Sequence, residues 1–162
     1  MAVKYSVTHT FEVPLEDLLK AREDRYKNLD KFPDLKNIEM LEEKKVGDIL
    51  HQKRKVHLGA SMPQVLATAL GDPSLMEEST FDLKSLVHEF RMYPPNKENV
   101  VQIRGKSLYA TLSPKESKRS YDIEIKSEVL FVSGLIEKAV EEIHRHTLEK
   151  DKASLRKFLN LD

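Results

Sequence analysis

The longest hydrophobic pattern in the chain repeats at steps of three and four residues over residues 133–159. Such spacing places apolar side chains on one face of an α-helix. At about 1.5 Å per residue this helix is roughly 40 Å long, enough to cross a small domain. We expect Ser133 to cap its start and Gly134 to let the backbone turn sharply out of a preceding strand. The pattern predicts a long helix on an apolar surface, which it contacts through Leu135, Ile136, Ala139, Val140, Ile143, Thr147, Leu148, Leu155, Phe158 and Leu159.

Most of the preceding sequence alternates between apolar and polar residues, which is typical of strands that bury one face. The alternation predicts strands over residues 3–13, 38–45, 49–58, 75–81, 86–93, 100–112 and 120–131. Within residues 100–112 the apolar positions change from odd, at Val101 and Ile103, to even, at Leu108 and Leu112. We therefore predict a β-bulge near Gly105, which would keep both halves of that strand facing inward.

Short helical segments lie between some of these strands. Residues 14–26 are expected to form a helix that starts at Pro14, and residues 32–35 a second short helical turn. Residues 63–70, between Pro63 and Gly71, predict a third helix between the third and fourth strands. The other consecutive strands are joined by short connections, which implies antiparallel pairing. The prediction is an α+β fold in which a seven-stranded, curved antiparallel sheet wraps around the long C-terminal helix.

The composition narrows the class of protein without naming a function. The 162 residues are expected to form a single domain over residues 1–162. Lys and Arg total 27, equal to Asp and Glu, so no basic surplus points to nucleic acid. The sequence holds no cysteine, and the strand pattern that begins at Val3 leaves no room for a signal peptide. No apolar run approaches the ~18 residues of a transmembrane helix, so we expect a cytoplasmic protein.

Short motifs in the sequence resemble segments of known protein families. Residues 130–137 (LFVSGLIE) resemble the strand-to-helix junction of a poorly characterised bacterial START-like family. Residues 59–63 (GASMP) through Leu70 and Gly71 resemble the loop and lid helix of that family and of PRELI-type phospholipid-transfer proteins. Residues 6–14 (SVTHTFEVP) also resemble the PRELI start. The order of elements is similar to the START-like (helix-grip, SRPBCC) superfamily over the whole chain. The resemblance implies an apolar or amphipathic ligand between sheet and long helix, with residues 63–70 as a lid.

The histidines give no metal-ligand spacing. His51 and His57 lie six residues apart on one strand, and no HExxH motif is present. There is also no Walker loop, GxGxxG or GxSxG motif, so we expect no metal, no cofactor and no catalytic residue that the sequence would identify. His9 and His88 interrupt apolar strand faces. Each is either a hydrogen-bonded inward histidine or a polar anchor for a ligand.

Two further features have alternative interpretations. Arg54 shares a strand face with Val56; if that face is inward, its guanidinium could hold a carboxylate or phosphate, and otherwise it lies on a solvated hairpin. The apolar residues of segment 63–70, among them Val65 and Leu66, either cover a pocket as a lid or cap the core. Met62 would add a pliable side chain to the lid.

These observations support three hypotheses about function. The first is binding or carriage of a hydrophobic or amphipathic small molecule, lipid or isoprenoid-like, in a cavity between the sheet and the C-terminal helix. The second is an enzyme of cyclase, aromatase or hydrolase type acting on an apolar substrate there, and the third is a protein-interaction module with a filled core. Transient membrane contact and the oligomeric state stay open. The residues predicted to contact a ligand are His9, Phe11, Arg54, Val56, Met62, Val65, Leu66, His88, Phe90, Ile103, Ile125, Ile136, Val140 and Ile143.

Overall fold

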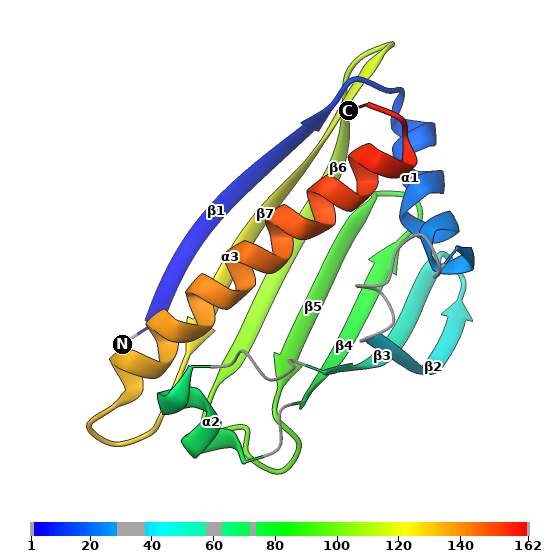
Figure 1. Cartoon of the computed structure of the whole chain (residues 1–162). Helices are drawn as coiled ribbons and strands as arrows, with labels where there is room; N and C mark the ends of the chain where they lie inside the picture. Colours follow the sequence, from blue (N-terminus) through cyan, green and yellow to red (C-terminus); the bar gives the residue numbers. More distant parts are fainter. Residues whose placement is uncertain (1, 29–37, 58–62, 72–73, 162) are drawn as a thin grey trace.

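The computed structural model describes residues 2–28, 38–57, 63–71 and 74–161. Seven strands form one antiparallel sheet in the order β1-β7-β6-β5-β4-β3-β2. The strands are β1 (Ala2–Phe11), β2 (Ile38–Val46), β3 (Ile49–His57), β4 (Ser74–Asp82), β5 (Val87–Tyr93), β6 (Gln102–Ser113) and β7 (Glu116–Lys126). The helical elements are α1 (Leu15–Asp24), the 3₁₀ turn η1 (Arg25–Lys27), α2 (Gln64–Leu70) and α3 (Ser133–Phe158). The predicted sheet and long helix are therefore confirmed (Figure 1).

The long helix α3 crosses the inner face of the curved sheet, with α1 at one end and α2 at the other (Figure 1). Ile136 is fully buried, and Val140, Leu148 and Leu155 are buried on the same side of α3. Leu135 was expected on this stripe but is 63% exposed. The helix begins without the predicted Ser133 cap, because Val132 occupies the capping position and no side chain caps the helix there.

The apolar interior has two parts. One lies around α2 and the first half of α3 and includes Leu66, Leu70, Ile103 and Ile136. The other lies around α1 and the end of α3 and includes Phe11, Leu18, Phe81, Tyr109 and Leu155. Among the described residues, no helix is both long enough and apolar enough to span a bilayer.

The β-bulge predicted near Gly105 is wrong. β6 pairs with β7 without a register shift from Gln102 to Thr111, and the irregularity lies between Thr111 and Ser113. The odd positions stay inward from Ile103 to Tyr109, so Leu108 lies on the outer face, and Leu112 is exposed as well. The prediction failed because the inner positions after Gly105 are Ser107 and Tyr109, which do not continue the apolar pattern of Val101 and Ile103. Gly105 instead makes room for an aromatic ring, since a Cβ there would lie 2.2 Å from Cζ of Phe90.

The strand predicted over residues 120–131 ends earlier than expected, at Lys126. The chain then leaves the sheet, and the backbone N–H of Ser127 donates to Oε2 of the buried Glu137 on α3 at 2.8 Å. Phe131 adopts a φ of 69° and is 94% exposed, so it is not an inward-facing residue of a strand, as the alternation had predicted. The predicted helical turn over residues 32–35 lies outside the described residues.

Burial of α3 can be tested with two neighbouring positions on the helix. Ile136→Asp places an unpaired carboxylate in the core, so we expect a loss of several kcal/mol in the free energy of unfolding. Leu135→Asp introduces the same group at an exposed position, where we expect a change within about 0.5 kcal/mol. Urea unfolding of both variants measures the difference. Equal stability of the two variants would contradict the packing of α3 described above.

The role of Gly105 can be tested by adding one methyl group. Gly105→Ala should destabilise the protein by about 1–3 kcal/mol, because the new Cβ forces the Phe90 ring to move. Gly134→Ala is the matched control, since no atom lies within 4 Å of a Cβ there, and it should be neutral or stabilising. In the background Phe90→Leu, which removes the ring, Gly105→Ala should cost measurably less. An unchanged cost in that background would rule out the contact as the cause.

Candidate functional site

A small apolar cavity lies on the inner face of the sheet, between β3, β4, β5, β6, α2 and α3. Its volume is about 50 Å³. It is lined by Val56, Leu66, Leu70, Leu75, Met92, Val101, Ile103, Val140, Ile143, His144 and Thr147. Of these residues Thr147 alone is exposed, so it marks the side on which the cavity approaches solvent. Pockets for larger small molecules typically hold about 300–1,000 Å³. A ligand of that size therefore requires neighbouring segments to move.

The short helix α2 forms one wall of this cavity through Leu66 and Leu70, which are both buried. Pro63 precedes the helix, and Gly71 ends it with a φ of 73°. Lys97 Nζ donates to the carbonyl of Leu70 at 3.0 Å, which satisfies one free acceptor at the helix end. Leu66 and Leu70 also belong to the main apolar core. The helix α2 thus forms a wall of the cavity with side chains that also belong to the core, and its role as a lid stays a prediction.

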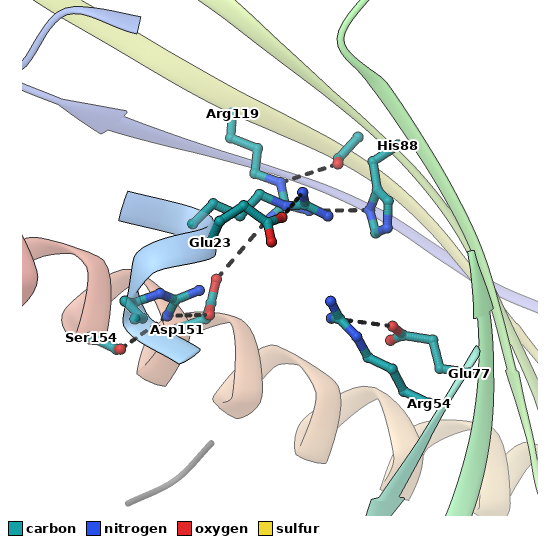
Figure 2. A network of polar contacts seen from close by, with 10 residues as sticks. Glu23, Arg54, Glu77, His88, Arg119, Asp151 and Ser154 are labelled. Atoms are coloured by element: carbon teal, nitrogen blue, oxygen red, sulfur yellow. Dashed lines mark hydrogen bonds and ion pairs between the residues drawn. The ribbon is translucent and has the colours of Figure 1, made fainter. Parts of the chain in front are cut away.

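A group of polar side chains lies on the same inner face, toward α1 and the second half of α3 (Figure 2). His88 on β5 is buried, and its Nδ1 lies 3.3 Å from Nη2 of Arg119. An arginine only donates, so Nδ1 is the acceptor and the neutral imidazole carries its proton on Nε2. That Nε2–H is buried without a hydrogen-bond partner among the described residues. Burial lowers the pKa of His88 well below its ordinary value, and the charges of Arg119, Arg22 and Arg54 lower it further.

Arg119 on β7 is held between two aromatic rings. Its guanidinium carbon lies 4.6 Å from the ring centre of Tyr109 and 4.5 Å from that of Tyr121. Its Nε donates to Ser107 Oγ at 3.1 Å. The nearest carboxylate contact, from Nη1 to Oδ2 of Asp151, is 4.0 Å, which is too long for a hydrogen bond. The buried hydroxyl of Tyr109 has no hydrogen-bond partner among the described residues.

Arg54 and Glu77 form a second part of the polar group. They are cross-strand partners on β3 and β4, and Nη1 of Arg54 lies 4.0 Å from Oε1 of Glu77. Burial raises the pKa of Glu77, although the Arg54, Arg119 and Arg22 charges oppose the rise. The side chains of Arg54 and Glu77 keep 12% and 16% exposure, so this part of the interior is reached from the β3–β4 side.

Arg22 and Arg25 bring two more guanidinium groups from the α1 side. Arg22 lies over the ring of Phe81 at 4.6 Å and donates to Glu23 at 2.7 Å. Arg25 donates to Asp151 on α3 at 2.8 Å. Burial alone would raise the pKa of Asp151, but the Arg25 and Arg119 charges outweigh it and lower the pKa below its ordinary value. Asp151 is therefore ionised at neutral pH and holds α3 to the turn η1.

Phe90 lies between the apolar cavity and the polar group. Its ring stacks on His88 with centres 5.5 Å apart and lies 6.1 Å from the ring of His144, which lines the cavity. Tyr5 on β1 is hydrogen-bonded through its hydroxyl to Nδ1 of His144. Burial lowers the pKa of His144 to about 4, so this histidine is neutral at neutral pH. The inner face thus changes along β5 from apolar at Met92 to polar at His88, which contacts the cationic Arg119.

The structure brings together only some of the predicted ligand contacts. Val56, Leu66, Ile103, Val140 and Ile143 line the cavity. Arg54 faces inward, which excludes the solvated hairpin face for this side chain. His88 faces inward too, and its role as a ligand anchor stays a prediction. Other predicted contacts lie away from the cavity lining. Ile125 and Ile136 are in the main apolar core, and Val65 packs against it. Phe11 is in the second apolar part, His9 lies beside Glu149, and Met62 is outside the described residues.

Sequence reasoning missed several residues of the polar group. Arg119 shares the parity of Tyr121 and Ile123 on β7, and Glu77 shares that of Leu75 on β4, so strand alternation alone could have placed both inside. Arg22, Arg25 and Asp151 carry no such signal, because a charged residue on a helix is usually solvated. Among the described residues, no three histidine, aspartate or glutamate side chains are grouped so that they could hold a metal ion.

A wider trough of about 1,260 Å³ lies on the outer face of the sheet. Its lining mixes side chains of both charges, such as Lys53, Glu78 and Arg104. Within it, Arg91 and Glu78 pair at 3.8 Å with both side chains partly exposed. Such a surface is an ordinary solvated sheet face, so we place the candidate site on the inner face.

No protein-family model and no curated protein matches the sequence. Solved structures share the fold. The chain is similar to the Zhui aromatase/cyclase from Streptomyces sp. R1128, with a TM-score of 0.68 and 12% identity over 96% of this chain and 92% of that one. It is also similar to Ara h 8.0201, with a TM-score of 0.65 and 12% identity over 99% of both chains. The similarity to norcoclaurine synthase from Thalictrum flavum has a TM-score of 0.65 and 13% identity over 98% of this chain and 87% of that one. The helix-grip fold is therefore confirmed.

The buried histidines predict how stability depends on pH. The pKa of His144 is about 4 in the folded protein and about 6.5 when unfolded, so the unfolded chain binds more protons between these values and stability falls as the pH drops. From His144 alone we expect a loss of about 2 kcal/mol between pH 7 and pH 5, measured by urea unfolding. His144→Gln should reduce this loss, whereas His146→Gln, at an exposed position on the same helix, should not. A parent protein equally stable at both pH values would contradict the prediction.

Proposed function

We propose that the chain binds an apolar or amphipathic small molecule between the inner face of the sheet and α3. The observation that carries the proposal is the apolar cavity that adjoins inward-facing polar side chains. Met92 lines the cavity and is the cross-strand partner of Glu77, while Val56 lies two residues from Arg54 on the same strand face. Ligand sites in proteins commonly combine such an apolar lining with a few polar groups that fix orientation.

The shape of the site supports entry of a ligand beside α2. Described residues of α2 pack mainly against α3 and leave only the small cavity beneath. A short element attached in this way can open at lower free energy than the strands of the sheet. The ligand would then enlarge the cavity by displacing α2, which gives the predicted lid a physical role. The solved structures with this fold include a protein described as an aromatase/cyclase and one described as norcoclaurine synthase.

Catalysis on the bound molecule is a second candidate, because two titratable groups with shifted pKa values, Glu77 and His88, face the interior. We rank binding first because Nδ1 of His88 already accepts from Arg119 and its low pKa makes the ring a poor proton acceptor. A ligand recovered in different chemical forms from the parent protein and from His88→Phe would favour catalysis.

Binding can be tested at the mouth of the cavity with the neutral probe N-phenyl-1-naphthylamine. We expect saturable binding to the parent protein, with a rise in probe fluorescence. Thr147→Trp places a large side chain at the exposed rim, so we expect at least about a tenfold loss of affinity with an unchanged melting temperature. His146→Trp adds the same group at an exposed neighbour that does not line the cavity, and its affinity should match the parent.

The introduced tryptophan also acts as a reporter, since the natural sequence has none. Quenching of its fluorescence by residual bound probe should be stronger for Thr147→Trp than for His146→Trp. A parent protein that binds neither this probe nor other apolar compounds would contradict the proposal. That result would favour the filled-core, protein-interaction hypothesis.

A further inference from the structure

The polar group inside the fold carries more positive than negative charge. Within the contacts of the described residues it contains four guanidinium groups, those of Arg22, Arg25, Arg54 and Arg119. Three carboxylates face them, those of Glu23, Asp151 and Glu77, and the contact of Arg119 with Asp151 is 4.0 Å long. A buried charge that lacks a counter-charge is costly. An anion bound at this place would offset that cost.

Among the described residues, Arg119 has fewer hydrogen-bond acceptors than N–H donors. A guanidinium has five N–H donors, and the two acceptors that the described residues offer to Arg119 are Ser107 and His88. Its carboxylate neighbour Asp151 lies at 4.0 Å and is already hydrogen-bonded to Arg25 at 2.8 Å. Tyr109 and Tyr121 cover the two faces of the guanidinium and leave only its edge for further contacts. An edge with free N–H groups is the part of an arginine that recognises oxyanions.

Two buried neutral donors lie beside Arg119 and also lack partners among the described residues. These are Nε2–H of His88 and the hydroxyl of Tyr109, whose side chains are both more than nine-tenths buried. His88 contacts Arg119 through its other ring nitrogen, and the ring of Tyr109 covers Arg119. Buried polar groups are nearly always hydrogen-bonded, so unpaired donors at one place indicate an acceptor that binds there.

The remaining contacts join this place to the apolar cavity. The ring of Phe81 lies 4.6 Å from Arg22, 6.2 Å from His88 and 5.8 Å from Tyr109, so these residues form one contiguous group. Figure 2 shows Arg54 extending from β3 toward the side where His88 and Arg119 lie. From Met92 in the cavity lining to His88 is four residues of β5, or about 13 Å along the strand. A chain molecule could therefore reach both.

We infer that Arg22, Arg54, Arg119 and His88 bind the oxyanion end group, a carboxylate or a phosphate, of an amphipathic molecule whose apolar chain occupies the cavity. This inference rests on the proposed function and names its ligand class. His88 serves as a neutral donor and the arginines supply the charge. Glu77, at the rim, limits the surplus charge when the site is empty.

The first test needs only the parent protein and four ligands measured by calorimetry at pH 8. Dodecanoate should bind at least about tenfold more tightly than dodecanol, since a hydrogen bond to a charged group is worth that factor or more. Dodecyl phosphate separates phosphate from carboxylate preference. Inorganic phosphate carries the charge without the chain; if it displaces dodecanoate, the oxyanion site is supported and free phosphate is an occupant.

The second test compares two variants of β3, one that loses a positive charge on the inner face of the sheet and one that loses a positive charge on the outer face. Arg54→Met should weaken dodecanoate binding about tenfold and leave dodecanol unchanged. Lys53→Met is the matched control, because it removes the same charge from the neighbouring residue on the outer face of the sheet. His88→Phe keeps a ring beside Phe90 but removes the Nε2 donor, so it should weaken the binding of dodecanoate and not that of dodecanol. This variant replaces Arg54→Met in the test if Arg54→Met does not fold.

The outcomes separate the inference from the proposed function. Dodecanol binding as tightly as dodecanoate to the parent protein would overturn the oxyanion site while leaving ligand binding intact. An equal loss of affinity for dodecanoate and dodecanol in Arg54→Met would also overturn it, because a structural change affects a charged and an uncharged ligand alike. Failure of all three ligands with an alkyl chain, dodecanoate, dodecanol and dodecyl phosphate, to bind would contradict the proposed function itself.

Discussion

Packing of α3 on the inner face of the sheet is the interaction on which the rest of the structure depends. It buries Ile136, Val140, Leu148 and Leu155 and decides which face of every strand is interior. Because strand side chains alternate, that choice also brings Arg54, Glu77, His88 and Arg119 inside. The polar group is thus a consequence of the same alternation that builds the core. Burial of a charge such as that of Arg119, whose contact with Asp151 is 4.0 Å long, is a costly way to stabilise a fold.

The interior has a different chemistry at each end of α3. Around α2 the side chains are aliphatic and enclose the small cavity. Around α1 the interior contains guanidinium groups stacked on Phe81, Tyr109 and Tyr121. Aromatic faces attract cations, so these rings stabilise charges that the apolar surroundings would otherwise disfavour. Phe90 separates the two regions and is accommodated because residue 105 has no side chain. One glycine therefore helps to set the boundary between the apolar and the charged part.

Much of this fold could be predicted from the sequence, and less of the site. Alternation and three- to four-residue spacing located the strands and α3 because burial of one face is a local property of the pattern. The errors arose where inward residues are polar. Ser107 and Tyr109 hid the continuous register of β6, and Ser117 and Arg119 hid the first residues of β7, which begins at Glu116 and not at residue 120. Contacts such as Arg25 with Asp151 join residues far apart in the chain, and no local pattern encodes them. The apolar lining was partly found because cavity and core residues follow the same periodicity.

The order of the strands has a consequence for how the protein is made. β1 lies at one edge of the sheet and pairs with β7, so that Ala2 meets Lys126. During synthesis the first strand must wait for nearly all the others before it finds its partner. Contacts so distant in sequence slow folding, and an apolar strand with an unpaired edge can associate with other chains in the meantime. We therefore expect nascent chains that lack β7 to depend on chaperones, and β1 to be the strand through which incomplete chains aggregate.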